Sequence, residues 1–283
     1  MDKILQWSIA LQSGDQETLK KLGAPDPKML QQLFGGPDEP TLMKQAITVV
    51  VNPDSELEAK EIAFDNFEML IENMDNANNI ENIKLWSPII DQLDASKPES
   101  LRVYAASIIG TAVQNNPNSQ EAFIKYPGLQ ALIDIASDPA TSSELLLKAL
   151  FAIASFVRNY EAGYLKFDEL DGWKIINLSR DSNHKVKLRI LSLISSILST
   201  GIDAKKEEHI SKAHMTEFLA SVLAKDGHAG CIDKVLNIIS QLAELKYQFS
   251  ASEIATFSQG LSNVEHMEEL STDDLHAAKK VIN

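Results

Sequence analysis

Five aspartates recur through this chain at intervals of 40, 44, 43 and 45 residues. Each one opens a short polar joint that contains proline, glycine, serine or asparagine, residues that interrupt helices. The joints begin at Asp54, Asp94, Asp138, Asp181 and Asp226. A helical pattern follows each joint, so one helical unit recurs along the chain, and the sequence predicts a repeat array.

The helix after each joint carries an apolar stripe at positions i, i+4, i+7 and i+8, the spacing that buries one face of a helix. Three copies superimpose residue by residue: Ala63, Phe67, Leu70 and Ile71; Ala105, Ile109, Ala112 and Val113; Ala149, Ile153, Phe156 and Val157. The three helices end on Asn73, Asn115 and Asn159. A fourth copy keeps Leu193 and Ile197 but has Arg189 and Ser196 at the other two positions, and a fifth is more divergent.

A period of about 40 to 47 residues with two or three helices per unit is typical of armadillo and HEAT arrays, whose units cover one another's apolar faces. A shorter helical piece begun by proline or glycine lies between each long helix and the next joint. Gly128 and Gly172 mark this piece 44 residues apart, which favours the three-helix armadillo unit. We therefore predict an all-α, armadillo-like, right-handed superhelical solenoid of about four to five repeats with helical caps.

The first part of the chain differs from the array. Glycine and proline crowd into residues 12–41, where helices can only be short. We expect residues 1–40 to form a flexible N-terminal segment with short apolar helices, and residues 41–283 to form the repeat array with its caps. Two apolar stretches in the segment contain Trp7 and, further on, Leu30, Leu33 and Phe34. They either remain free or fold back to cap the first repeat.

Charge and composition exclude several classes of protein. The net charge is −14 and the chain has four arginines, which argues against nucleic-acid binding because phosphate contacts require concentrated Lys and Arg. No stretch of 18 apolar residues is present, and the N-terminus lacks the pattern of a secretory signal. We expect a cytoplasmic protein. Its single cysteine, Cys231, forms no internal disulfide and is typical of a core residue.

The sequence contains no motif that predicts catalysis. A phosphate-binding loop, a nucleophile elbow and a His-Glu-x-x-His pair are all absent. His209 and His214 are five residues apart, on different faces of a helix, so they do not suggest a metal site. We expect a protein that is not an enzyme and needs no cofactor or metal.

Several stretches carry a more specific resemblance: LQWSIA at 5–10, PDPKMLQQLFGG at 25–36, PTLMK at 40–44, AFDNFEMLIEN at 63–73, DNANN at 75–79 and IIGTAVQNN at 108–116. With these the chain resembles the fungal cytosolic armadillo-type nucleotide exchange factor of the 70-kDa heat-shock chaperone, in the family of the heat-shock-chaperone-binding proteins. The resemblance is close over residues 1–127, and afterwards mainly the repeat framework persists.

The resemblance implies a co-chaperone without covalent chemistry. It would hold one lobe of the chaperone's ATPase domain against the curved repeat surface and so promote ADP release, supporting protein folding and clearance of misfolded proteins. A factor that binds the open, nucleotide-poor conformation better must weaken nucleotide binding by the same ratio. The partner would be the nucleotide-binding domain of the chaperone, with no nucleic acid and no membrane, and the protein would be a monomer. The resemblance also implies that the N-terminal segment, through Trp7, Leu30, Leu33 and Phe34, aids client release.

The inner face of such a solenoid must consist of long-helix residues outside the stripe, together with the turns that follow them. The candidates for partner binding are Asp65, Glu68, Glu72, Ala77, Gln114, Asn115, Arg158 and Arg189. Arg189 replaces a small residue of the stripe, so it is either an interface anchor or an arginine whose stem covers apolar surface. Ala77 is either a small contact residue or part of an ordinary turn.

An armadillo adaptor that binds extended peptides is the alternative. Such adaptors carry a ladder of Trp and Asn on their long helices. Here the Asn positions hold Met69, Thr111, Ser155 and Ser195, and the Trp positions hold Asp65, Ser107, Phe151 and Leu191. Because the ladder is absent, the amides that would pair with a peptide backbone are missing, which favours the exchange factor.

Overall fold

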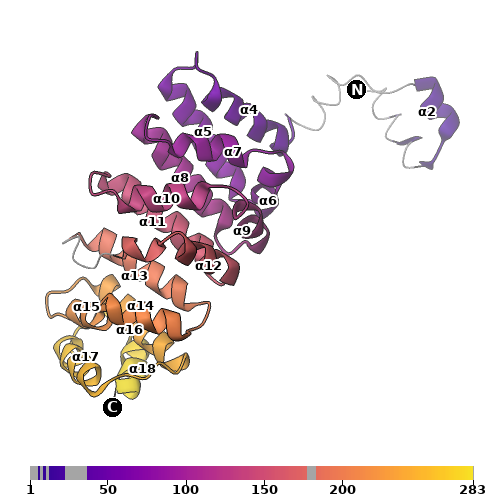
Figure 1. Cartoon of the computed structure of the whole chain (residues 1–283). Coiled ribbons are helices and arrows are strands. Elements are labelled where there is room, and N and C mark those ends of the chain that lie inside the picture. The colour runs from indigo at the N-terminus through magenta and orange to yellow at the C-terminus, as the bar shows by residue number, and fades with distance from the viewer. Residues whose placement is uncertain (1–5, 7–8, 11–12, 23–36, 177–182, 283) are drawn as a thin grey trace.

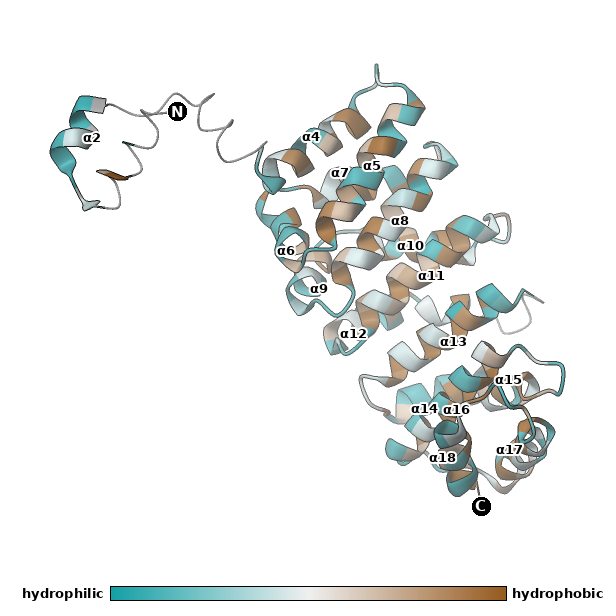
Figure 2. Cartoon of the chain, turned by 180° about the vertical axis from the view of Figure 1, so that it is seen from behind, coloured by the Kyte–Doolittle hydropathy of each residue, from teal (hydrophilic) through white to brown (hydrophobic). Residues whose placement is uncertain are grey.

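The computed structural model describes residues 6, 9–10, 13–22, 37–176 and 183–282. Every regular element within these residues is a helix. Figure 1 shows them stacked in chain order as an elongated array, from α4 at the N-terminal end to α18 at the C-terminal end. A short preceding helix, α2 (Gln16–Leu22), stands apart from the array in Figures 1 and 2.

Five long helices form one continuous layer, and we call them the third helices. They are α5 (Leu57–Ile71), α8 (Glu99–Val113), α11 (Ser143–Val157), α13 (His184–Leu198) and α16 (Ala229–Glu244). Each packs against the next along the chain. Hydrophobic residues line these helices, whereas the turns that join them are mostly hydrophilic (Figure 2).

Shorter helices precede four of the third helices and complete four units. They are α6 (Met74–Asn82), α7 (Trp86–Ile90) and the 3-10 turn η1 (Asp91–Leu93); α9 (Pro117–Phe123) and α10 (Gly128–Ser137); α12 (Glu161–Glu169) and the 3-10 turn η2 (Gly172–Ile175); α14 (Ala204–Lys212) and α15 (Met215–Val222). At the two ends lie α4 (Glu39–Val51) and the pair α17 (Ala251–Val264) and α18 (Thr272–Ile282). The prediction of three-helix units is confirmed in the described residues.

The apolar stripes predicted from the sequence form the core between units. Of their twelve residues, all are buried except Leu70, which is partly buried. Each stripe therefore contributes a face that the neighbouring helices remove from water, the main stabilising term in a solenoid. In the fourth copy Leu193, Ser196 and Ile197 are buried, and Arg189 is partly exposed.

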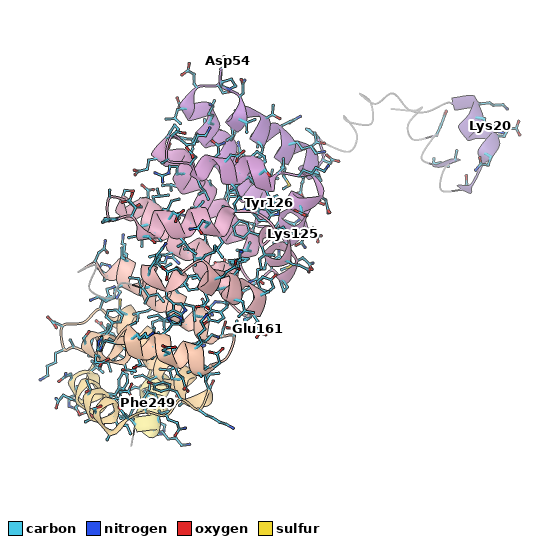
Figure 3. The ribbon with its side chains drawn as sticks, viewed as in Figure 1. Lys20, Asp54, Lys125, Tyr126, Glu161 and Phe249 are labelled. Atoms are coloured by element: carbon cyan, nitrogen blue, oxygen red, sulfur yellow. The ribbon has the colours of Figure 1, made fainter. Side chains whose placement is uncertain are left out.

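The aspartate joints are the turns that precede the third helices. Asp94 and Asp138 accept hydrogen bonds from the backbone N–H groups of Ser96 and Ala140, at 2.9 and 2.8 Å, and side-chain bonds of this kind stabilise turns. Asp54 lies in the turn between α4 and α5, at the outer end of the array (Figure 3). Asp181 lies outside the described residues.

Asparagines end two third helices for a conformational reason. Asn115 and Asn159 have φ values of 51° and 54°, and asparagine tolerates this left-handed region better than most residues. The equivalent Asn73 instead caps the next helix, because its side chain accepts the N–H of Asp75 at 2.9 Å.

Polar side chains tie the units together at their edges. Tyr126 donates to Glu81 at 2.9 Å, and the Lys125 ammonium lies 3.6 Å from the same carboxylate; both residues stand on one edge of the array in Figure 3. Gln120, which is buried, donates to the carbonyl oxygens of Ser155, Phe156 and Arg158 at 3.0 to 3.1 Å. These carbonyls end α11 and have no partner within the helix.

Candidate partner-binding surface

The exposed side of the third helices is hollowed at two places, and we call this side the third-helix face. The first hollow, about 400 Å³, lies between α5, α8 and α11. The second, about 310 Å³, lies between the end of α8, α11 and α13. Both are open to solvent and lined mainly by polar and charged side chains, with a few apolar ones among them, a mixture that a surface binding another protein can have.

A chain of polar contacts crosses the first hollow. Lys148 on α11 donates to the Ser107 hydroxyl at 2.9 Å, and that hydroxyl donates to the carboxylate of Glu68 on α5. Burial raises the pKa of the neighbouring Tyr104, and the negative charge of Asp65 raises it further. Three carboxylates, Glu68, Glu99 and Glu144, and one ammonium group, that of Lys148, line this hollow, so its charge is net negative.

The second hollow brings four of the predicted residues together. Gln114, Asn115, Arg158 and Arg189 all line it. The guanidinium of Arg189 lies over the ring of Phe151, 5.1 Å from its centre. This geometry is a cation–π contact that fixes the direction of the arginine.

Cations gather around the second hollow. Lys234 on α16 donates to the Ser195 hydroxyl at 3.0 Å. Burial lowers the pKa of Lys234, and the positive charge of Arg158 lowers it further. Arg158, Arg189 and Lys234 thus make this part of the face cationic, opposite in sign to the part around Glu68.

Three predicted residues occupy the same place in successive repeats. Glu72, Gln114 and Arg158 are the residues that follow the last turn of α5, α8 and α11. Glu72 is exposed, as is Asp65 on α5, and neither lines one of the two hollows. Glu68 lies between them in the sequence and does line the first hollow.

The structure contradicts the expectation that the Ala77 side chain is available at the surface. Ala77 is 3% exposed and lies inside α6. Asn73 caps this helix, so α6 begins at Met74. Ala77 lies on its buried side together with Asn76 and Ile80. The adjacent Asn76 is also buried, and its amide donates to Glu39 at 2.7 Å and to the carbonyl of Leu70 at 2.9 Å.

Four predicted residues of the N-terminal segment, Trp7, Leu30, Leu33 and Phe34, lie outside the described residues. Conversely, the sequence reasoning did not select Ser107, Lys148, Phe151 or Lys234, although the structure places them on the third-helix face. A signal was present for Phe151, since it is a large apolar residue outside the apolar stripe.

Comparisons with known proteins agree with this architecture. A family model described as nucleotide exchange factor Fes1 matches residues 1–80. A second, described as the SIL1/FES1/HPBP1 C-terminal domain, matches residues 76–225. This chain belongs to the Fes1 nucleotide exchange factor family. The resemblance inferred from the sequence stretches is therefore confirmed.

Fes1 relatives match over the whole length. The Hsp70 nucleotide exchange factor FES1 of Debaryomyces hansenii is 62% identical, and that of Scheffersomyces stipitis is 61% identical, each over 100% of both chains. The protein of the same name from Saccharomyces cerevisiae is 44% identical, again over 100% of both chains.

Solved structures confirm the fold. A designed armadillo repeat protein in complex with the peptide (KR)4 superimposes with a TM-score of 0.69 and 16% identity, covering 85% of this chain and 99% of that one. A second designed armadillo repeat protein gives a TM-score of 0.68 at 17% identity, over 85% and 100% of the two chains. At these identities the likeness establishes the armadillo fold alone. In the described part of this Fes1-family chain, no helix has the length and apolar character needed to span a membrane.

Proposed function

We propose that this protein binds the ATPase domain of an Hsp70 chaperone through its third-helix face and promotes the release of ADP. The observation that carries the proposal is the family membership, with full-length matches to relatives named Hsp70 nucleotide exchange factor FES1. The third-helix face supports it, since it carries two hollows rich in polar side chains that together extend over three third helices, α5, α8 and α11, and onto a fourth, α13.

The mechanism needs no covalent chemistry, no cofactor and no nucleotide site in this chain, and in this proposal the protein is not an enzyme. The factor acts by differential affinity for two conformations of the chaperone. If it binds the open conformation more tightly than the closed, ADP-bound one, linkage requires that it weaken ADP binding by the same ratio. A rigid solenoid suits this task because it holds its contact residues in one arrangement.

The charge distribution of the third-helix face would set the direction of binding. Glu68 and Asp65 would face a basic part of the ATPase domain, and Arg158 and Arg189 an acidic part. Opposite charges at the two ends favour one orientation over its reverse, since like charges brought together oppose association.

We also propose where and in what form the protein works. The protein acts as a monomer in the cytoplasm, supporting protein folding and quality control, and residues of the N-terminal segment aid the release of unfolded clients. The exposed Ile9, at 56%, supports an apolar contact of that kind.

The test is the release of a fluorescent ADP analogue from the isolated Hsp70 ATPase domain. Saturating protein should accelerate release about tenfold or more, which corresponds to lowering the barrier to ADP dissociation by about 1.4 kcal/mol. The double variant Arg158→Glu, Arg189→Glu should lose most of this effect. Lys212→Glu is the control for reversing a charge elsewhere on the surface, because Lys212 is exposed on α14 and lines neither hollow; each single variant, Arg158→Glu or Arg189→Glu, is compared with it. An unchanged release rate with wild-type protein would refute the proposal.

A further inference from the structure

An apolar groove lies at the N-terminal end of the array, between α4 and α5. Its volume is about 760 Å³, and its lining includes Leu42, Val49, Ile62 and Met69. Ile62 and Met69 are 57% and 65% exposed. The groove is separate from the two hollows of the third-helix face, with which it shares no lining residue.

A comparison of α5 with the equivalent helix of the next repeat, α8, shows what the groove residues would normally contact. The residues of α8 that are equivalent to Ile62 and Met69, 42 positions later, are Tyr104 and Thr111. Both contact the preceding third helix: the Tyr104 ring lies 6.2 Å from that of Phe64, and the Thr111 hydroxyl lies 3.4 Å from the Glu68 carboxylate. Ile62 and Met69 therefore point to the place that a preceding third helix would occupy.

The chemistry of this surface is unusual for the end of a solenoid. Terminal repeats normally present a polar outer face, since nothing follows to cover them. Here the two positions that are aromatic and polar in α8 are aliphatic in α5, and both are largely exposed. A large exposed apolar side chain in such a groove indicates an occupant.

We propose that residues 29–34 of the same chain dock in this groove. The segment carries Met29, Leu30, Leu33 and Phe34, whose spacing places all four on one side of a helical turn. Gly35 and Gly36 separate it from α4 and allow the chain to reverse. One family model spans residues 1–80, so the same family unit contains both the segment and the two walls of the groove.

The residues between the segment and α4 are long enough to let the segment reach the groove. Four residues separate Phe34 from Glu39 at the start of α4, and the five Cα–Cα steps between the two span up to about 17 Å when extended. Val49, at the far end of the groove, is ten residues into α4, about 15 Å along the helix axis. The segment can therefore lie against the full length of the groove.

Docking has a direct consequence for the segment. Its apolar side chains would be covered by Ile62 and Met69, and any other partner of residues 29–34 would compete with this groove. Residues 29–34 would thus stay bound in the groove until another partner displaces them. This inference does not depend on the proposed exchange activity.

Disulfide trapping tests the proposal in the full-length chain. The only cysteine, Cys231, is buried, so Cys231→Ser provides a cysteine-free background. Oxidation of the Leu33→Cys, Met69→Cys pair should give an intramolecular disulfide in high yield at low protein concentration. The control pair is Leu33→Cys with Leu165→Cys, since Leu165 is 55% exposed on α12. Equal yields from the two pairs would overturn the proposal, and so would disulfide-linked dimers, which would assign the groove to a second copy.

A second measurement avoids cysteine. In protein labelled at methionine and isoleucine methyl groups, the double variant Leu33→Glu, Phe34→Glu should shift the NMR signals of Met69 and Ile62 and leave that of the buried Met215 in place. Gln31→Glu, Gln32→Glu is the matched control, because it adds the same charge on the polar side of the segment. Unchanged Met69 and Ile62 signals in the first variant would show that the segment does not occupy the groove.

Discussion

Arg189 on α13 and Phe151 on α11 meet across a junction between repeats, with the guanidinium carbon 5.1 Å from the centre of the ring. The contact explains how a residue in the register of a buried stripe remains partly exposed. Its charged end lies over an aromatic face and lines the second hollow instead of entering the core. Arg189 is thereby held in one direction before any partner arrives, which lowers the entropy cost of binding.

Arg189→Ala should weaken the complex with the Hsp70 ATPase domain while changing stability little. Truncating a central interfacial arginine costs on the order of 2 kcal/mol, or about thirtyfold in affinity. Loss of the exposed cation–π contact should cost less than about 1 kcal/mol of unfolding free energy. Calorimetric titration and urea denaturation measure the two effects.

Arg102→Ala is the matched control for this prediction. Arg102 is on α8, and its Nε donates to the carbonyl of Leu93 at 3.1 Å, away from the two hollows. This variant should lose stability and keep its affinity. If Arg189→Ala instead lowers Tm and keeps its affinity, Arg189 has only a structural role.

Ala77→Arg should destabilise the fold. Ala77 is 3% exposed in α6, and forcing a long charged side chain into a packed interior costs about 3 kcal/mol or more. Thermal denaturation should show a clear fall in Tm, together with any loss of chaperone binding. Ala77→Ser, a change of one polar atom, is the comparison and should retain most of both. A wild-type Tm for Ala77→Arg would mean that α6 moves readily away from its neighbours.

Glu68 and Lys148 should be coupled through the Ser107 hydroxyl, which bonds to both. A double-mutant cycle with Glu68→Gln and Lys148→Met should give a coupling free energy of about 0.5 to 1 kcal/mol in urea denaturation. The same cycle in a Ser107→Ala background should give a value near zero, because the bridging hydroxyl is gone. Equal coupling in both backgrounds would mean that the two charges interact directly.

The cap of α17 should make stability sensitive to acid. Ser250 and Glu253 form a capping box, in which the Glu253 N–H donates to the Ser250 hydroxyl at 3.2 Å and the Ser250 N–H donates to the carboxylate at 2.7 Å. Burial acts to raise the pKa of Glu253, but the hydrogen bonds it accepts, from Ser250 first, outweigh this and lower the pKa below 4.5.

Because the folded pKa lies below the unfolded one, this stabilisation is complete above pH 4.5 and is lost as pH falls through the folded value. Glu253→Gln should therefore be less stable than wild type by about 1 kcal/mol at neutral pH. The difference should shrink on acidification below pH 4.5, as measured by urea denaturation at a series of pH values. A difference that stays constant down to about pH 3 would contradict this linkage.

The repeat layers were predictable because the pattern that specifies them is local. Ala105, Ile109 and Val113 share a face through the geometry of one helix, whatever lies beside it. Asn115 and Asn159 were likewise readable as helix ends, since their preference for the left-handed region belongs to the residue type.

The site was less predictable because it depends on neighbours from other repeats. The four residues Gln114, Asn115, Arg158 and Arg189 could be selected as lying outside the stripe, but their meeting in one hollow follows from how α8, α11 and α13 pack. Ala77, by contrast, was selected wrongly. The polar residues around it suggested a surface turn, whereas Asn73 caps α6, so that Ala77 lies within a helix, on the side that packs into the core.

The buried amide of Gln120 also bears on how the chain folds as it leaves the ribosome. Its three acceptors, at the end of α11, are made 35 to 38 residues after it. A nascent chain that stops short of Ser155 therefore cannot bury α9 without leaving that amide unpaired, at a penalty of about 1 to 3 kcal/mol. In this unit, vectorial synthesis therefore delays the burial of α9 until the end of α11 has emerged.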